Sequence, residues 1–432
     1  MNNRINRLDH PQRKVLNDEA HARPSEALPT SCAVSYFARL SDRANPEREF
    51  ELLQEFCREY ELTAPQPGVK HYAADTGQFR VRWERHTEFA RYAITVDDPI
   101  TEPFAEPPIR LVSPDWLDQV EGSLLVAVHT RITEHHDQEL DLRAISKEYF
   151  EGEIMVGSKI ADGAAVALTD FRIRKDGFSH LLVLNDCMNP TQTGRMVQRL
   201  LEIESYRMMT LLALPLAQSL GPRLTDMERE FSDISTTLAS KGNEGDQQLL
   251  DRIIQLEAES ESTRMNSQFR FSAAEAYYEL VQQRTAELRE SRIRGLQTFE
   301  EFTQRRLTPA VKTCRSTATR QHSLSDRMAR ATQLLSTRVD VDRQRQNQIL
   351  LSKMNQRAKT QLRLQATVEG LSVAAITYYV VGLVGYIGKG LQDVGLPVQP
   401  TVVTGLSVPL IALLIFLAVR RVRRGLSRNK DT

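Results

Sequence analysis

Residues 371–387, LSVAAITYYVVGLVGYI, and residues 401–419, TVVTGLSVPLIALLIFLAV, are two uncharged apolar tracts near the end of the chain. Each tract approaches the length of about 20 residues that a helix needs to cross the hydrocarbon core of a bilayer. The short segment between them contains Gly390, Gly395 and Pro397, which indicate a turn. Together they predict two transmembrane helices joined by a tight connection.

The charges around the two tracts predict their orientation. Bases precede the first tract and follow the second: Lys353, Arg357, Lys359 and Arg363 before it, then Arg420, Arg421, Arg423, Arg424, Arg428 and Lys430. The segment between the tracts carries only Lys389 and Asp393. Because cytoplasmic flanks are enriched in Lys and Arg, both flanks are expected in the cytoplasm and the short segment outside. A buried helical hairpin of a soluble protein is the alternative, which the tract lengths and the arginine cluster disfavour.

These observations predict a multi-pass membrane protein whose N- and C-termini lie in the cytoplasm. Transmembrane helices are expected over 368–388 and 401–419, with an external loop over 389–400 and a basic tail over 420–432. The N-terminal stretch MNNRINRLDHPQRK lacks the apolar run of a secretory signal. Four widely separated cysteines favour free thiols in a reducing compartment.

Residues 1–190 are predicted to form an α+β cytoplasmic domain with an antiparallel sheet. The expected elements are strands at 32–40, 79–83, 88–95, 123–132, 153–160, 164–174 and 178–185, a helix at 46–60 and a connecting loop at 99–114. Asp162-Gly163 and Asp176-Gly177 stand between the last three strands. Asp-Gly between apolar runs marks a hairpin because such turns need positive φ.

The remainder of the soluble part is predicted to be helical. Residues 191–245 are expected to form connecting helices, and residues 246–367 a long antiparallel helical stalk. Its first helix is expected to end at a turn or kink formed by Thr308 and Pro309. The next helix would then run from about 310 to 388, roughly 120 Å at 1.5 Å per residue.

Opposite charges on the two stalk segments favour their antiparallel pairing. Residues 244–301 contain twelve acids and seven bases, whereas residues 305–363 contain fourteen bases and three acids. Pairing an acidic helix with a basic one would satisfy both. The apolar positions expected at the contact are Leu324, Met328, Ala331 and Leu335. The apolar spacing is absent from residues 339–348, which are polar nearly all round the helix. This stretch is therefore expected to be exposed or held by interhelical ion pairs.

Asp18, Glu19, His21 and Arg23 form a compact polar cluster near the N-terminus. The letters DEAH match a helicase box, but that box requires an upstream phosphate-binding loop that this sequence lacks. A loop held together by hydrogen bonds is therefore favoured over a catalytic role.

The sequence gives little indication of a metal site or of nucleic-acid binding. Adjacent His135 and His136 point in different directions on any regular element, so a solvated loop is favoured over a metal site. Lys plus Arg and Asp plus Glu both number 56, and this balance gives no argument for nucleic-acid binding. The sequence predicts a lipid bilayer as partner, no nucleic acid, no enzymatic activity, no cofactor and no catalytic or metal-ligating residues.

The first apolar tract and its ends supply candidate residues for an ion path. Glu369 stands at the cytoplasmic mouth and Asp393 in the external loop, and between them lie Thr377, Tyr378, Gly382, Gly385 and Gly388. In an oligomer, each carboxylate would form a ring that concentrates cations, whereas in a lone helix Glu369 is an interfacial anchor, which is favoured. The small residues allow either self-association or packing on the second tract of the same chain.

Two segments resemble the hallmark segments of a bacterial family of uncharacterised membrane-anchored proteins. They are LNDEAHARPSEALP at 16–29 and VEGLSVAAITYYVVGLVGYIGKGL at 368–391, and the similarity extends over nearly the whole chain. The resemblance implies anchorage in the bacterial inner membrane. It brings no catalytic residues with it.

The overall plan is also similar to that of CorA-type magnesium channels, which join a cytoplasmic α/β domain to a stalk helix and two spans. This resemblance implies a homo-oligomer, a pentamer in those channels, with the first span lining a path for a divalent cation. Their Gly-Met-Asn motif is missing, because Gly385-Tyr386-Ile387-Gly388 stands in its place. Two hypotheses follow: an oligomeric CorA-like cation channel or transporter, or a non-conducting scaffold that tethers the cytoplasmic domain to the membrane.

Overall fold

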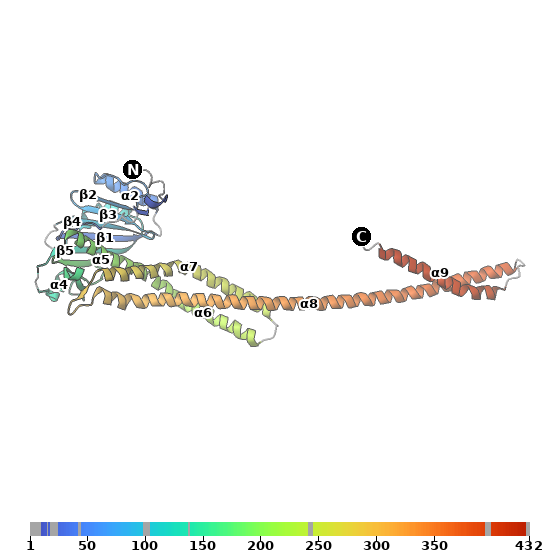
Figure 1. Ribbon diagram of the computed structural model, residues 1–432. Helices are drawn as coiled ribbons and strands as arrows, with labels where there is room; N and C mark the ends of the chain where they lie inside the picture. The colour runs from blue at the N-terminus through green and yellow to red at the C-terminus, as the bar shows by residue number, and fades with distance from the viewer. Residues whose placement is uncertain are drawn as a thin grey trace. The chain divides into compact units, whose positions relative to one another are not determined.

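The computed structural model describes residues 10–14, 16–17, 25–41, 45–97, 104–136, 139–240, 245–393 and 399–428 (Figure 1). The chain divides into two compact units. Unit 1 comprises residues 1–240 and 251–332, and unit 2 comprises residues 241–250 and 333–432. The helices after residue 190 that were expected to connect separate domains therefore belong largely to the same compact unit as the sheet.

Unit 1 contains one nine-stranded sheet with the order β2-β3-β4-β1-β5-β8-β7-β6-β9. The strands are β1 (Cys32–Leu40), β2 (His71–Asp75), β3 (Arg80–Arg85), β4 (Phe89–Asp97), β5 (Ser123–Glu134), β6 (Val156–Ile160), β7 (Ala165–Thr169), β8 (Ser179–Asn185) and β9 (Ser291–Arg292). The predicted α+β class is confirmed. The sheet is mostly antiparallel, but β5 and β8 pair in parallel, so it is a mixed sheet and not the purely antiparallel one expected.

The parallel pair arises from the crossover between β5 and β8. The chain leaves β5, forms α4 (Leu142–Tyr149) and the hairpin β6–β7, and then returns beside β5 as β8. Asp162 at φ 58° and Gly163 at φ 92° make the predicted turn of that hairpin. Gly177, at φ 88°, lies in the turn that leads into β8. The residues after Thr169 leave the ladder, which ends β7 earlier than predicted.

The helices of unit 1 cover both faces of the sheet. Helices in the described part of the chain include α2 (Pro46–Glu59), η2 (Pro108–Leu111), α3 (Pro114–Gln119), α4, η3 (Ala161–Gly163), α5 (Pro190–Leu211), α6 (Ala213–Ser240), α7 (Asp246–Glu287), α8 (Phe299–Asp393) and α9 (Pro400–Arg428). On one face, Phe56 and Trp116 of α2 and α3 pack with Trp83 of β3. On the other, Leu200 of α5 joins Tyr36 of β1 in a second core.

Helices α6, α7 and α8 pack together within unit 1. The hydroxyl of Ser260 on α7 lies 3.1 Å from that of Ser325 on α8, and Ser267 donates to Gln321 over 3.2 Å. These pairs run in opposite senses along the chain, so α7 and α8 are antiparallel within unit 1. Helix α6 joins them through Arg320 of α8, which lies 2.7 Å from Glu228.

The long helix predicted over 246–307 is in fact two helices. Helix α7 ends at Glu287, and α8 begins at Phe299 and runs through Pro309 without ending there. The intervening segment is held by tertiary contacts, because β9 pairs with β6 and Leu288 is fully buried. The Glu290 carboxylate accepts the backbone N–H groups of Phe299 and Glu300 and so caps the start of α8.

Unit 2 contains the rest of α8 and all of α9. Arg343 donates to Gln247 over 3.0 Å, which ties α8 to the first turn of α7. From 344 to 367 the side chains of α8 are exposed, and within the described part of the chain no hydrogen bond or ion pair connects them to another element. The antiparallel pairing expected over all of 246–367 therefore stops well short of the apolar tracts.

Candidate functional site

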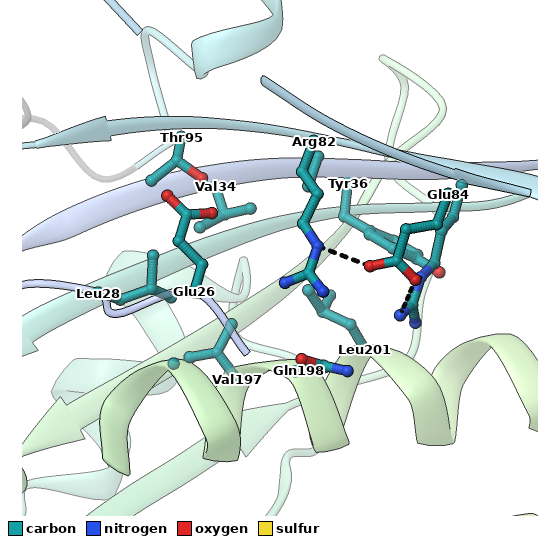
Figure 2. A pocket seen from close by; sticks show the side chains of 13 residues that line it. Glu26, Leu28, Val34, Tyr36, Arg82, Glu84, Thr95, Val197, Gln198 and Leu201 are labelled. Atoms are coloured by element: carbon teal, nitrogen blue, oxygen red, sulfur yellow. Dashed lines mark hydrogen bonds and ion pairs between the residues drawn. The ribbon is translucent and has the colours of Figure 1, made fainter. Parts of the chain in front are cut away.

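A cavity lined by charged and apolar side chains lies in unit 1 between the sheet and α5 (Figure 2). Its volume is about 60 Å³. Strands β1, β3 and β4 form its roof, α5 forms its floor, and the extended segment 25–28 closes one side. Charged side chains of β3 and β4 face α5 across this cavity.

Strand alternation explains how the charges gather there. Arg82 and Glu84 are two residues apart on β3 and therefore project from the same face of the sheet. Arg91 of β4 stands directly opposite Glu84 in the ladder. On α5, Gln198 and Glu202 are four residues apart and therefore share the face toward the sheet.

These side chains form a buried ion-pair network. Glu84, which is 1% exposed, lies 2.6 Å from Nε of Arg82 and accepts a hydrogen bond of 2.8 Å from Nε of Arg91. Arg91 also lies 3.3 Å from Glu202, which pairs in turn with Arg284 of α7. The network therefore connects the sheet to α5 and α7.

The network keeps its carboxylates ionised. Burial alone would raise the pKa of Glu84, but the guanidinium groups of Arg91 and Arg82 outweigh it and leave the pKa below its ordinary value. The pKa of Glu202 is likewise lowered, because Arg91, Gln198 and Arg284 together outweigh its desolvation.

Two polar groups at the cavity lack a protein partner. Oε1 of Gln198 is buried without a hydrogen bond, although its Nε2 donates to Glu202 over 2.8 Å. Arg82 uses Nε for Glu84, and its two terminal nitrogens make no hydrogen bond within the described part of the chain. Figure 2 shows the Arg82 guanidinium reaching from the sheet toward Gln198 on the helix.

The segment that closes the cavity belongs to the second half of the hallmark stretch 16–29. The backbone N–H of Leu28 donates to Pro190 over 3.0 Å, and Glu26 pairs with Arg80 at the rim. A Cβ at position 194 would overlap the backbone carbonyl of Glu26, so the segment fits on α5 only because that residue is glycine. The predicted polar cluster, Asp18, Glu19, His21 and Arg23, lies outside the described residues.

A second polar string lies beneath η2. The ring Nδ1 of His129 lies 3.0 Å from the hydroxyl of Ser35, and its Nε2 lies 3.6 Å from Asp176. The residue types are those of a hydrolase triad, but Ser35 is fully buried and its oxygen already accepts the backbone N–H of Ile109. His129 also stacks on Phe178 with ring centroids 3.9 Å apart. The bonds from Ile109 to Ser35 and between Ser35 and His129 therefore form a structural hydrogen-bond chain.

His129 makes the stability of unit 1 sensitive to acid. Burial lowers the pKa of His129 to about 4, whereas an unfolded histidine titrates near 6.5. Because the unfolded chain binds the proton first, stability falls by about 3 kcal/mol as the pH drops from about 6.5 to about 4. Urea unfolding followed by the fluorescence of Trp83 and Trp116 measures this loss across that pH range.

The matched variants for this prediction are His129→Gln and His136→Gln. The first should flatten the pH dependence, because it removes the buried titrating ring. The second should leave it unchanged, because His136 is an exposed side chain of unit 1. A His129→Gln protein with the same pH dependence as the natural one would contradict the prediction.

The structure places the candidate pore residues on different faces of α8. A Cβ on Gly385 would lie 3.3 Å from Oγ1 of Thr404, and one on Gly388 would lie 3.6 Å from Pro400, so both glycines face α9. Gly382 has open space around it. The sequence allowed either self-association or packing within the chain. At Gly385 and Gly388, the first tract packs against the second tract of the same chain.

The remaining pore candidates do not join that face. Tyr378 is 77% exposed, and the hydroxyl of Thr377 donates to the backbone of Val373 one turn earlier. Glu369 accepts from Gln365 over 3.3 Å. At 100° per residue, Glu369 lies about 160° around the helix from Gly385. The side chain of Asp393 lies outside the described residues.

The comparisons with known proteins give one result. A family model described as "Protein of unknown function (DUF3422)" matches residues 8–426. No curated protein and no solved structure matches the chain, and nothing found supports the predicted similarity to CorA-type channels.

Proposed function

We propose that this chain, which belongs to that family of proteins of unknown function, is a non-conducting membrane anchor that presents unit 1 at the cytoplasmic face of the bacterial inner membrane. Both ends of the chain would lie in the cytoplasm. In this proposal α8 and α9 form the anchor, and the protein is not itself an enzyme.

The anchor is supported by two helices that are long and apolar enough to cross a membrane. Their apolar windows are almost entirely unburied, at 0% and 6%. Large side chains such as Leu371, Tyr378 and Leu406 are about two-thirds to three-quarters exposed. Each would cost about 1.5–3 kcal/mol in water relative to a buried state, so a lipid environment is the favourable one.

The single observation that favours a non-conducting anchor is the packing of Gly385 and Gly388 on α9. Because this face is occupied by the same chain, it is not available to line a central path with other copies. The residues from 371 to 388 contain no ionisable acid or base. A cation on that path would meet neither carboxylates nor a Gly-Met-Asn filter.

A CorA-like channel is the second candidate, and Glu369 is the observation that favours it. This carboxylate is partly buried just before the first span, and a homo-oligomer such as a pentamer would gather several of them around an axis. Glu369 lies about 160° around the helix from Gly385, which packs on α9.

Flux measurements separate the two candidates. The full chain is reconstituted into liposomes, and uptake of Mg²⁺, Co²⁺ and K⁺ is compared with that of protein-free liposomes. We expect equal rates. Uptake at least tenfold faster, abolished by Glu369→Gln but not by Glu279→Gln on α7, would establish conduction and overturn the proposal.

Cysteine crosslinking tests the packing on which the proposal rests. In a chain whose four natural cysteines are replaced by serine, Gly385→Cys with Thr404→Cys should form a disulfide within one chain on mild oxidation, because a Cβ at position 385 would lie 3.3 Å from Oγ1 of Thr404. Gly382→Cys with Thr404→Cys is the matched control and should not. Mass spectrometry of the monomer band detects the linked peptides. A predominantly dimeric product from the first pair would show that this face contacts a second copy instead.

A further inference from the structure

We propose that the cavity between the sheet and α5 is a binding site for a small carboxylate that also carries a hydroxyl group. The ligand's carboxylate would pair with Arg82 and its hydroxyl would donate to Gln198. This inference concerns unit 1 alone and does not depend on membrane anchorage.

Arg82 supplies the group that selects a carboxylate. Its Nε is fixed by Glu84 at 2.6 Å, which holds the planar guanidinium in one orientation. The terminal nitrogens are left facing the cavity, and this fork matches the two oxygens of a carboxylate. Because this guanidinium is already oriented, it loses less conformational entropy on binding a ligand than a mobile surface arginine would.

Gln198 supplies the group that selects a hydroxyl. Its Oε1 is buried and has no hydrogen-bond donor. The amide cannot simply be reversed, because its Nε2 donates to the carboxylate of Glu202 over 2.8 Å. Leaving a buried acceptor without a donor is unfavourable, and a ligand hydroxyl would supply the missing donor.

The other charges of the site argue against a cation or a phosphate. The carboxylates of Glu84 and Glu202 are already paired with arginines, and Glu26 is paired with Arg80. A cation would therefore meet no free carboxylate. Arg91 is likewise taken up by Glu84 and Glu202, which leaves one guanidinium end for a single negative charge rather than for a phosphate dianion.

Size and lining define the class further. At about 10–15 Å³ per water-sized group, the cavity of about 60 Å³ admits about five non-hydrogen atoms. Its other walls are largely apolar, from Leu28, Val34, Ala93, Val197 and Leu201, and they also include Tyr36 and Thr95. A hydroxy acid of two carbons fits this space and places its methylene against those walls.

The test uses calorimetric titration of the full chain in detergent with glycolate, acetate and inorganic phosphate. Glycolate should bind saturably, and acetate should bind at least tenfold more weakly because it leaves the oxygen of Gln198 without a donor. Phosphate should also bind at least tenfold more weakly. Absence of saturable glycolate binding, or phosphate or acetate binding as tight as glycolate, would overturn the proposal.

Variants locate the binding. Arg82→Lys keeps the charge but loses the fork, and it should weaken glycolate binding at least tenfold. Ala93→Leu fills the cavity from the position that pairs with Arg82 in the β3–β4 ladder, and it should abolish binding. Arg172→Lys, on an exposed side chain paired with Glu153, is the control and should bind as the natural protein does. Circular dichroism verifies that each variant is folded, and a folded Arg82→Lys or Ala93→Leu protein with unchanged affinity would refute the site.

Discussion

The Gly194→Ala variant is expected to lose several kcal/mol of stability and to release the segment 25–28 from α5. The added Cβ would overlap the carbonyl oxygen of Glu26, which is backbone and cannot rotate away. Overpacking of this kind costs about 1–3 kcal/mol or more. Displacing the segment would also break the Leu28 to Pro190 hydrogen bond and expose Leu28, which is buried. Urea unfolding monitored by tryptophan fluorescence measures the loss, and limited proteolysis detects the released segment.

Gly221→Ala is the matched control for this substitution. Gly221 lies inside α6, and a Cβ there would meet no atom within 4 Å. Alanine is a better helix former than glycine by about 1 kcal/mol, so this variant should be as stable as the natural protein or slightly more so. Equal stabilities of the two variants would show that the segment does not lie on Gly194.

The Glu202→Leu variant is expected to lose about 3–5 kcal/mol, because it leaves Arg91 buried with one partner fewer. Arg91 is 7% exposed, and Glu202 also anchors Arg284 and Gln198. The substitution would therefore remove the ion pairs that join α5 to Arg91 of the sheet and to Arg284 of α7. Urea unfolding gives the free energy, and the double variant with Arg91→Met should recover none of it, because Glu84, which is 1% exposed, would then lose its partner on β4.

An exposed ion pair provides the comparison. Asp226 and Arg229 on α6 are 3.1 Å apart, with side chains 73% and 70% exposed. Because water screens such pairs, Asp226→Leu should have little effect on stability. If Glu202→Leu were equally mild, the network around Arg91 would not be a structural link between the sheet and the helices.

Local chemistry made part of the fold predictable. The hairpin at Asp162-Gly163 and the turn at Asp176-Gly177 were expected because the turn residues themselves specify the conformation. The strand at 32–40 matched β1 residue for residue because it is rich in apolar and aromatic residues and is largely buried. Strand β2 was missed because it is a short edge strand whose alternating side chains are half exposed.

Long-range contacts decided the features that local patterns missed. Pro309 predicted the end of a helix in the wrong place. The helix in fact ends before Glu290, because β9 pairs with β6 there and the Glu290 carboxylate caps the start of α8. The cavity was missed because Arg82 and Arg91 are far in sequence from Glu202 and become its neighbours only through sheet register and the docking of α5. The one local signal was the alternation of charge in β3, RVRWER, which is unusual for a strand that is largely buried.

The side of the membrane on which each part lies is tested most directly by cysteine labelling in intact spheroplasts. The natural Cys187 is exposed in unit 1, whereas Cys32, Cys57 and Cys314 are buried. In a chain that retains Cys187, and in a chain whose only cysteine comes from Gly390→Cys, an impermeant maleimide is applied before and after lysis. We predict that position 390 reacts before lysis and that Cys187 reacts only after it. Labelling of Cys187 in intact spheroplasts, or recovery of the protein in the soluble fraction without detergent, would contradict the account.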